Sequence, residues 1–427
     1  MYYINKGVKF QKGFVNTCIY NFNNKELLVL NQSDADRLLQ GDNCLEKGFY
    51  EKLIEHGVIT DDYTERELSP LNFNYELFDD NNTYQVCKTL YFEVTNKCNY
   101  YCMHCYARMS NAGTKDLDID TYRKYIANLG NDLNFDVRLT GGEPFLNPNI
   151  RDLIDITFEN IKPYTVHSIV TNGSFEYEKA LYALEKGFEL QISIYGMKEE
   201  TFKKFARADV LYHKKTFTNL ERLSKTSFTN QVVLLLSINS LTYDEIEEYV
   251  NFAKKYGFKA MLNRPASIGR AIDNWETLKL SPKQHINFNR YNKLLVKGYN
   301  RYCYHACRLT WSYVDINANV KPCAFIRNKI SFGNLLDDSL YEIRNSDSFC
   351  QFRDFNASSF DKCNECEFKY ACTGGCCGET LEYTGEITDT YPWCVVKPYK
   401  KKYLTIMPNE IYIAEKYSGG TFDFEKI

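Results

Sequence analysis

The sequence predicts an α/β protein built around a parallel β-sheet, and two features of residues 87–300 favour this fold class. Short apolar runs alternate there with helical stretches, which is typical of parallel βαβ units. Glycine-rich or polar segments follow several of the runs, at the edge where such folds place an active site. Six runs are predicted to be strands: residues 90–94, 136–139, 166–170, 190–196, 231–238 and 256–262.

Three further units are predicted around this sheet. Residues 1–86 form an N-terminal unit that ends in an acidic, polar linker over residues 60–86. Residues 301–396 form a cysteine-rich domain, and residues 397–427 form a C-terminal extension. Short strands followed by two amphipathic helices fit a winged-helix-like N-terminal unit. Its expected strands are at 2–4, 15–22 and 26–30 and its helices at 33–40 and 49–56; helices are also expected at 243–255 and 282–297.

Three cysteines follow the first strand in the run Cys98-Asn-Tyr-Tyr-Cys102-Met-His-Cys105. This C-x3-C-x2-C loop offers three thiolates to a cubane of four irons and leaves the fourth iron without a protein ligand. Because protein-held cubanes normally have four cysteine ligands, another molecule is expected to complete the site. A zinc knuckle is the alternative, since closely spaced cysteines often bind zinc.

A glycine turn follows the second strand in the run Thr140-Gly141-Gly142-Glu143-Pro144. The two glycines allow backbone groups to approach a ligand closely, and Glu143 supplies negative charge beside a cationic amine. These residue types therefore predict a binding site for a small molecule at the end of this strand.

The cysteine loop and the Gly-Gly-Glu-Pro turn, in this order, resemble the radical S-adenosylmethionine (SAM) enzymes. The resemblance implies a partial (β/α)6 barrel, in which SAM chelates the open iron and is split into methionine and a 5′-deoxyadenosyl radical. Tyr195 stands where the family often has an acidic residue, and His104 where it usually has an aromatic ring near the adenine. Arg207 matches the position of an arginine that binds the SAM carboxylate in the family, and the alternative is an exposed helix arginine without this role. The SAM-binding residues that the resemblance implies are Gly141, Gly142, Glu143, Ser193 and Arg207.

A second set of eight cysteines lies beyond residue 300: Cys303, Cys307, Cys323, Cys363, Cys366, Cys372, Cys376 and Cys394. Eight thiolates are what two fully protein-ligated cubanes need. The central spacing C-x2-C-x5-C-x3-C resembles the SPASM extension of some radical SAM enzymes, which binds two auxiliary [4Fe–4S] clusters. Three [4Fe–4S] clusters and SAM are therefore the expected cofactors, and a pair of structural zinc sites is the alternative. By the resemblance, one auxiliary cluster is held by Cys303, Cys307, Cys323 and Cys376, and the other by Cys363, Cys366, Cys372 and Cys394.

Several positions in and around this set remain open. If Cys303 is not a ligand, the first auxiliary cluster has an open iron that could hold a substrate thiolate. Ala318 stands where the family usually has glycine, which affects a turn and no ligand. Cys377 adjoins a ligand and is an alternative to it or a bystander. Buried, inert thiols account for Cys18, Cys44, Cys87 and Cys350.

Charge and hydropathy argue against nucleic-acid and membrane partners. The net charge is −3, and residues 1–88 contain 14 acidic and 9 basic side chains, so no part has the basic field that nucleic-acid binding needs. The longest apolar run, residues 232–236, is too short to span a membrane, and a secretory signal is not expected. Sixteen cysteines without an export signal favour metal ligation in a reducing cytoplasm.

The predicted function is the oxidative cross-linking of side chains in a ribosomally made precursor peptide. The N-terminal unit resembles the leader-recognition domain of peptide-modifying enzymes, in which an extended leader adds to a sheet edge. A subdomain with no peptide-binding role is the alternative. A thioether from a cysteine sulfur to a peptide carbon is the expected product, followed by a carbon–carbon cross-link. A flavodoxin or ferredoxin is the expected reductant, and the general base stays open.

Three other classes of function are alternatives to peptide cross-linking. An anaerobic sulfatase-type maturase, which oxidises a Cys or Ser side chain, has the same barrel and SPASM cysteines but would not need the N-terminal unit. A small-molecule SPASM dehydrogenase would likewise lack a peptide-binding module. A non-catalytic peptide-binding or zinc scaffold would have no use for the Gly-Gly-Glu-Pro turn.

Overall fold

The computed structural model describes part of the chain. The described residues are 3–5, 7–12, 16–21, 23, 26–39, 47–60, 89–130, 134–281, 284, 311–327, 329–354, 359, 363, 374–389 and 391–392.

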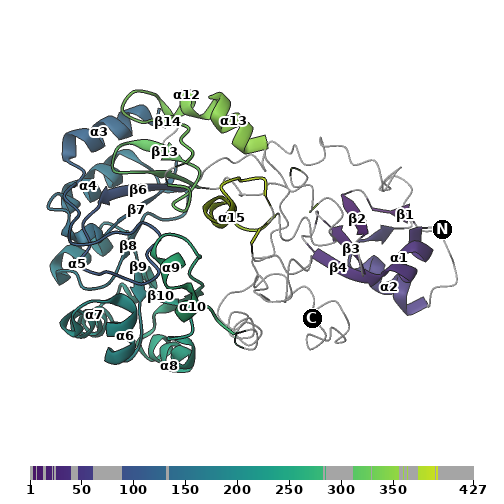
Figure 1. Ribbon diagram of the computed structural model, residues 1–427, viewed down its shortest axis with the longest axis horizontal. Helices are drawn as coiled ribbons and strands as arrows, with labels where there is room; N and C mark the ends of the chain where they lie inside the picture. The colour runs from purple at the N-terminus through teal and green to yellow at the C-terminus, as the bar shows by residue number, and fades with distance from the viewer. Residues whose placement is uncertain are drawn as a thin grey trace.

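Six parallel strands form most of a nine-stranded sheet, which lies on the left in Figure 1. Each strand pairs with the next one in the chain, which is the arrangement that successive βαβ units produce. All six predicted strands are confirmed. They are β6 (Thr89–Thr95), β7 (Asp136–Gly141), β8 (Ser168–Thr171), β9 (Glu189–Ile194), β10 (Val232–Ser237) and β11 (Lys259–Asn263).

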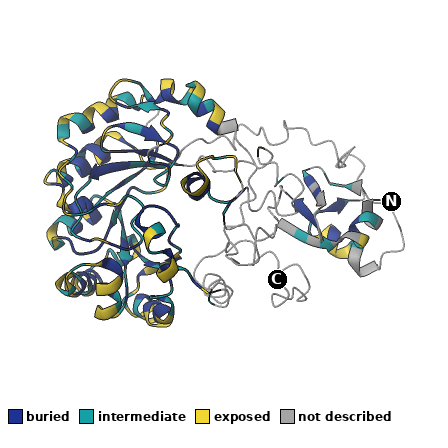
Figure 2. Ribbon diagram, viewed as in Figure 1, coloured by how far each residue is buried: buried dark blue, intermediate teal, exposed yellow. Residues whose placement is uncertain are grey.

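Helices cover one face of this sheet, and the strands alternate accordingly. Leu90, Phe92 and Val94 of β6 belong to the same apolar core as helix residues of the connecting segments, whereas Tyr91 and Glu93 point to the opposite face. Figure 2 shows the buried residues concentrated along the strands. The covering helices are α3 (Ile119–Asn128), α4 (Ile150–Asn160), α5 (Tyr177–Glu185), α6 (Glu199–Ala206), α7 (Val210–Leu223) and α8 (Ile246–Tyr256).

The inner face of the sheet is polar. Arg138 of β7 donates to the hydroxyls of Tyr91 on β6 and Ser168 on β8. Closed eight-stranded barrels fill this space with branched apolar side chains. A polar interior instead suits a barrel that admits a polar ligand.

The C-terminal part continues the same sheet. Strand β12 (Trp311–Val314) pairs in parallel with β6, so the sheet has the order β11-β10-β9-β8-β7-β6-β12-β13-β14. Strands β13 (Asn319–Lys321) and β14 (Gly333–Asn334) add to it in antiparallel fashion. The remaining described helices after β11 are α9 (Arg270–Asp273), α10 (Trp275–Leu278), α12 (Leu340–Arg344), α13 (Asp347–Asp354) and α15 (Cys377–Thr384).

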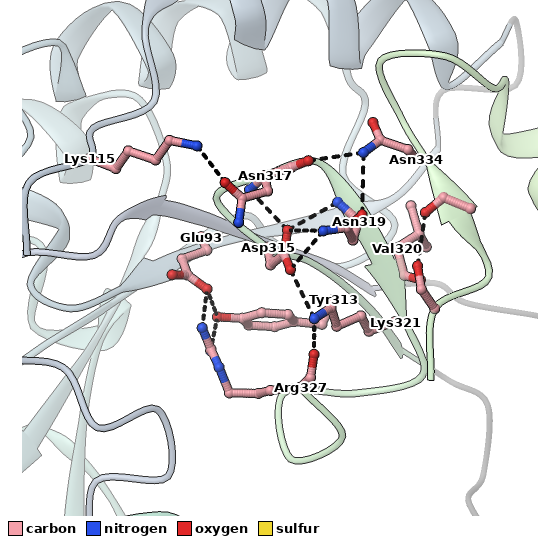
Figure 3. A network of polar contacts seen from close by, with 12 residues as sticks. Glu93, Lys115, Tyr313, Asp315, Asn317, Asn319, Val320, Lys321, Arg327 and Asn334 are labelled. Carbon is pink, nitrogen blue, oxygen red and sulfur yellow. Dashed lines mark hydrogen bonds and ion pairs between the residues drawn. The ribbon is translucent and has the colours of Figure 1, made fainter. Parts of the chain in front are cut away.

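A buried polar network joins β6 to the C-terminal strands. Figure 3 shows the Glu93 carboxylate accepting hydrogen bonds from the Tyr313 hydroxyl at 2.6 Å and from Arg327 Nη2 at 2.8 Å. The Lys321 ammonium lies 2.9 Å from Asp315 and also donates to the Arg327 carbonyl. These charged groups are paired inside the protein, as burial of charge requires.

The N-terminal unit contains a three-stranded antiparallel sheet followed by two helices. The strands expected in this unit correspond to β1 (Tyr3–Ile4), β3 (Asn16–Asn21) and β4 (Glu26–Asn31), and the helices to α1 (Gln32–Leu39) and α2 (Lys47–Glu55). The sequence analysis missed β2 (Val8–Lys12) and β5 (Ile59–Thr60), although β2 alternates apolar and polar residues. The winged-helix assignment itself stays a prediction.

Several predictions lie outside the described residues. They are the domain boundaries at residues 86, 300 and 396, most of the linker 60–86, the bulk of the helix 282–297 and the extension 397–427. Within the described ranges, no helix combines the length and apolarity needed to cross a bilayer.

Candidate functional site

The three cysteines of the first loop lie together at the end of β6. Cys102 is buried, and Cys98 and Cys105 are partly buried. All three are free thiols that belong to a single apolar cluster. The other members of this cluster are Tyr100, Phe202, Ala206, Tyr195, Ala208 and Tyr212.

The end of helix α6 supports this loop. The backbone N–H of Tyr101 donates to the Ala206 carbonyl at 3.1 Å, and that of Met103 donates to the Phe205 carbonyl at 2.9 Å. The last carbonyls of a helix have no partner within it, so they are available to a neighbouring loop. The loop is thereby tied to a strand–helix unit a hundred residues further along the chain.

A second support is Arg270, which the sequence analysis did not single out. Its side chain is buried and donates to the carbonyls of Cys102 at 2.9 Å and Met109 at 2.6 Å. Its backbone N–H donates to the Cys105 carbonyl at 3.0 Å, and its guanidinium lies 3.9 Å from the centre of the Tyr101 ring. A guanidinium can reach several carbonyls at once because its donors form a rigid fork.

Close backbone packing explains the glycine turn. A Cβ on Gly141 would overlap the Thr95 carbonyl oxygen, and one on Gly142 would overlap that of Lys97. The N–H groups of Gly142 and Glu143 donate to these same two carbonyls at 2.8 Å. The turn is therefore pressed against the strand end that leads into the cysteine loop.

The Glu143 carboxylate is buried and is engaged by the end of β8. It accepts hydrogen bonds from the Thr171 hydroxyl and from the Asn172 backbone N–H, both at 2.7 Å. Burial raises the pKa of Glu143 to about 7, and these hydrogen bonds offset only part of that rise. The Asn172 side chain in turn donates to the Asn99 side chain at 2.8 Å, beside Cys98.

Ser193 and Tyr195 lie at the end of β9, and Tyr195 contacts the cysteine loop. Ser193 is partly buried near the end of β9. The Tyr195 ring contacts Tyr100 with a centroid separation of 5.6 Å and His104 with one of 5.5 Å. Burial raises the pKa of Tyr195 well above its usual value and lowers that of His104 to about 4. Both side chains are therefore neutral near pH 7.

Arg207 follows α6 directly and has a left-handed backbone conformation, with φ of 49°. Its side chain is exposed, and Nη2 donates to the Asn274 side chain at 2.6 Å. The structure thus places Arg207 next to the carbonyls that hold the cysteine loop.

The donor set of the first loop fits a metal cluster. Burial raises the pKa of Cys98 to about 12 and that of Cys102 well above its usual value, so the metal-free protein favours the thiols, and a bound cation would favour the thiolates. Among the described residues, no three Cys, His, Asp or Glu side chains converge as a preformed metal site.

Three of the eight C-terminal cysteines are described. Cys323 and Cys363 pack against the main core, whereas Cys376 precedes α15 and packs against the apolar cluster that contains Met103 of the first cysteine loop. The other five, Cys303, Cys307, Cys366, Cys372 and Cys394, lie outside the described residues.

Comparison with known families accounts for both cysteine regions. The model of the radical SAM superfamily matches residues 92–253, and that of the SPASM iron–sulfur cluster-binding domain matches residues 303–367. The chain is a radical SAM/SPASM enzyme. The cysteine loop and the glycine turn with Glu143 of this radical SAM/SPASM enzyme lie within the first match, residues 92–253.

Two curated relatives are similar in sequence to this radical SAM/SPASM enzyme. The antilisterial bacteriocin subtilosin biosynthesis protein AlbA of Bacillus subtilis is 26% identical over 303 residues, which cover 67% of this chain and 66% of AlbA. The mycofactocin maturase MftC of Mycolicibacterium smegmatis is 25% identical over 324 residues, covering 68% and 78%. The chain thus spans about two thirds of the first relative.

Solved structures share the fold of this chain. SuiB of Streptococcus suis bound to S-adenosylmethionine aligns with a TM-score of 0.57 at 16% identity, covering 91% of this chain and 98% of SuiB. SuiB bound to its precursor peptide SuiA gives 0.55 at 17% identity, covering 92% and 99%. Native anSMEcpe with bound AdoMet also gives 0.55, but covers 71% of this chain and 93% of that structure.

Proposed function

We propose that this radical SAM/SPASM enzyme oxidatively cross-links side chains of a ribosomally made precursor peptide. The observation that carries the proposal is the extent of the structural likeness. The SuiB fold, solved with a precursor peptide, covers 92% of the chain, whereas anSMEcpe covers 71%. The names of the curated relatives, a bacteriocin biosynthesis protein and a maturase, point in the same direction.

The residues of the first loop suit a three-cysteine cluster with SAM. Cys98, Cys102 and Cys105 would hold the [4Fe–4S] cluster, and the proposed SAM contacts are Gly141, Gly142, Glu143, Ser193 and Arg207. When bound, the cluster and SAM supply a one-electron reductive cleavage that produces a hydrogen-abstracting radical. The chain's own part is to orient these groups and to keep water away with the apolar cluster around Cys102.

The proposed auxiliary sites account for the electron balance. A cross-link removes two hydrogens from the peptide, so a second electron must leave after the hydrogen abstraction. The eight C-terminal cysteines would hold the two [4Fe–4S] clusters that accept it, and a flavodoxin or ferredoxin would supply the first electron. A reducing cytoplasm is the compartment that suits these cysteines.

The N-terminal sheet offers a site for the leader part of the peptide. In the order β2-β3-β4, both outer strands have an unpaired edge within that described sheet. An extended leader could add to such an edge through main-chain hydrogen bonds. The polar inner face of the barrel, lined by Tyr91, Arg138 and Ser168, would then receive the core part.

A thioether to a cysteine sulfur is the product that we favour, and a carbon–carbon cross-link comes second. A sulfatase-type maturase, which oxidises a single Cys or Ser side chain, is the second candidate function, because a radical SAM barrel followed by a SPASM domain suits that class as well. That reaction would also remove two hydrogens, but it would leave no bond between side chains.

Anaerobic reconstitution with iron and sulfide tests the proposal first. About 12 irons per chain and release of 5′-deoxyadenosine with dithionite and SAM are expected for three cubanes. Incubation with each short peptide encoded beside the gene should then give a product lighter by two hydrogens, with a cross-link between side chains in its fragment spectrum. About 4 irons with zinc would contradict the auxiliary clusters, and oxidation without a cross-link would favour the sulfatase-type reaction.

A further inference from the structure

Glu379 is a buried acidic side chain with no role in the proposed reaction. It lies in the first turn of α15, and its side chain is about 1% exposed. Oε1 accepts hydrogen bonds from the Ser267 backbone N–H at 2.8 Å and from the Ser267 hydroxyl at 2.7 Å. Oε2 accepts one from the Tyr391 hydroxyl at 2.8 Å and lies 3.6 Å from Arg264 Nη2. Such complete pairing is what a buried carboxylate requires.

Two of these partners, Arg264 and Ser267, belong to the segment 264–270. The C-terminal end of this segment forms hydrogen bonds with the first cysteine loop. A Cβ on Gly269 would overlap the Tyr106 carbonyl oxygen. The next residue, Arg270, makes the three hydrogen bonds to the carbonyls of Cys102, Cys105 and Met109 described above. Glu379 and the cysteine loop therefore hold opposite ends of one seven-residue segment.

An apolar contact runs beside this polar one. Met103, which stands between Cys102 and Cys105, lies in the same apolar cluster as Tyr391 and Cys376. Cys376 is also the N-cap residue of α15, directly before its first residue Cys377. The start of α15 is thus joined to the cysteine loop by a polar and an apolar set of contacts, and Tyr391 takes part in both.

We propose that Glu379 is a positioning residue that couples the SPASM domain to the cysteine loop of the barrel. Its contacts are with Ser267, Tyr391 and Arg264 and not with the first three cysteines; it fixes Arg264 and Ser267, and through them the placement of Gly269 and Arg270. The Cys98–Cys105 loop then keeps its conformation only while α15 is docked. The inference rests on the radical SAM assignment and is independent of the peptide substrate.

Glu379→Gln tests the coupling, with Glu382→Gln as its matched control. Both substitutions remove one negative charge from the same helix, but the Glu382 side chain is exposed. Gln at position 379 cannot accept from Arg264, Tyr391 and Ser267 together, since its amide nitrogen is a donor.

Hydrogen exchange of the metal-free protein is the first measurement. In E379Q, amides in residues 98–110 should exchange about tenfold faster, the factor that corresponds to one lost hydrogen bond. Exchange in α4, which is remote from the segment, should stay unchanged in E379Q. E382Q should match the wild type throughout. Faster exchange confined to residues 264–268 and α15 would overturn the proposal.

Reconstituted protein gives the second readout, without any peptide. In E379Q, 5′-deoxyadenosine release at saturating SAM should fall about tenfold, and the change that SAM causes in the electron paramagnetic resonance signal of the reduced protein should weaken. A SAM response equal to that of the wild type would contradict the coupling.

Ser267→Ala keeps the test decisive if E379Q does not fold. It leaves every charge in place and removes one of the four contacts, so a smaller effect in the same direction is expected. Where both fold, the double variant should be no worse than E379Q, because both substitutions interrupt one path. Additive effects would mean that the two residues act separately.

Discussion

Burial is the main influence on the pKa of the Glu143 carboxyl group. Desolvation raises its pKa to about 7, against an ordinary value of 4.5, in spite of the hydrogen bonds from Asn172 and Thr171. In the metal-free protein, the fold therefore favours the protonated acid over the carboxylate between these two pH values.

This preference gives a pH dependence with a definite sign. The folded state binds the Glu143 proton more tightly than the unfolded state, so the contribution is present in full below pH 4.5 and is lost as the pH rises to about 7. The loss from this group is roughly 3 kcal/mol. Glu143→Gln should flatten the urea-unfolding profile of the metal-free protein over this range. Parallel profiles of variant and wild type would contradict the assignment.

Ala318 shows a conformation that favours glycine, at the position where the family resemblance implies glycine. Its φ is 69° and its side chain is fully buried in the turn between β12 and β13. Ala318→Gly would relieve about 1–2 kcal/mol of left-handed strain, but would lose a buried methyl of about 0.8 kcal/mol and add about 0.5–1 kcal/mol of chain entropy.

These contributions nearly cancel. The urea midpoint of A318G should therefore stay close to that of the wild type, whereas Ala318→Val should lower it clearly, because β-branched residues are outliers at positive φ. A large gain in stability for A318G would mean that the strain is greater than the backbone angle indicates.

Among the elements, the glycine turn after β7 leaves no space for a side chain at Gly142. Gly142→Ala would drive a methyl group into the Lys97 carbonyl, so the turn and the start of the cysteine loop must separate. We expect G142A to lose iron from the first site and to release 5′-deoxyadenosine at least tenfold more slowly.

Gly187→Ala is the matched control for this prediction. Gly187 also has a positive φ, of 81°, but its Cβ would meet no atom within 4 Å. It should cost about 1–2 kcal/mol of stability through backbone strain alone and leave SAM cleavage intact. Equal loss of cleavage in both variants would show that strain, and not the clash, disables the site.

The sequence predicted the elements that depend on local patterns and missed the contacts that do not. The six barrel strands are apolar runs bounded by polar turns, and Cys98, Gly141 and Ser193 follow from their places at strand ends. Arg270 could not be found in this way, because the carbonyls that it holds are 161 to 168 positions away. The only local signal was a glycine followed by an arginine after the last strand. The ligand and SAM-contact assignments stay predictions.

At the scale of the whole molecule, a buried ion pair fastens the barrel to the C-terminal strands. Glu93 of β6 has almost no exposed surface and pairs with Arg327 at 2.8 Å. Glu93→Gln leaves the cation buried with a neutral partner, which is expected to lower the free energy of unfolding by about 3–5 kcal/mol. Glu178→Gln removes an exposed pair with Arg222 and should leave the urea midpoint unchanged. Similar midpoints for the two variants would contradict the structural role of Glu93.

The pairing of β12 with β6 has one more consequence. Without the residues from 311 onward, β6 would present a full row of unpaired N–H and C=O groups, flanked by Leu90, Tyr91 and Phe92. A bare apolar edge of this kind is a template for strand addition and aggregation. The isolated barrel should therefore self-associate in size-exclusion chromatography, and the C-terminal domain serves as the cover that prevents one molecule from extending the sheet of the next.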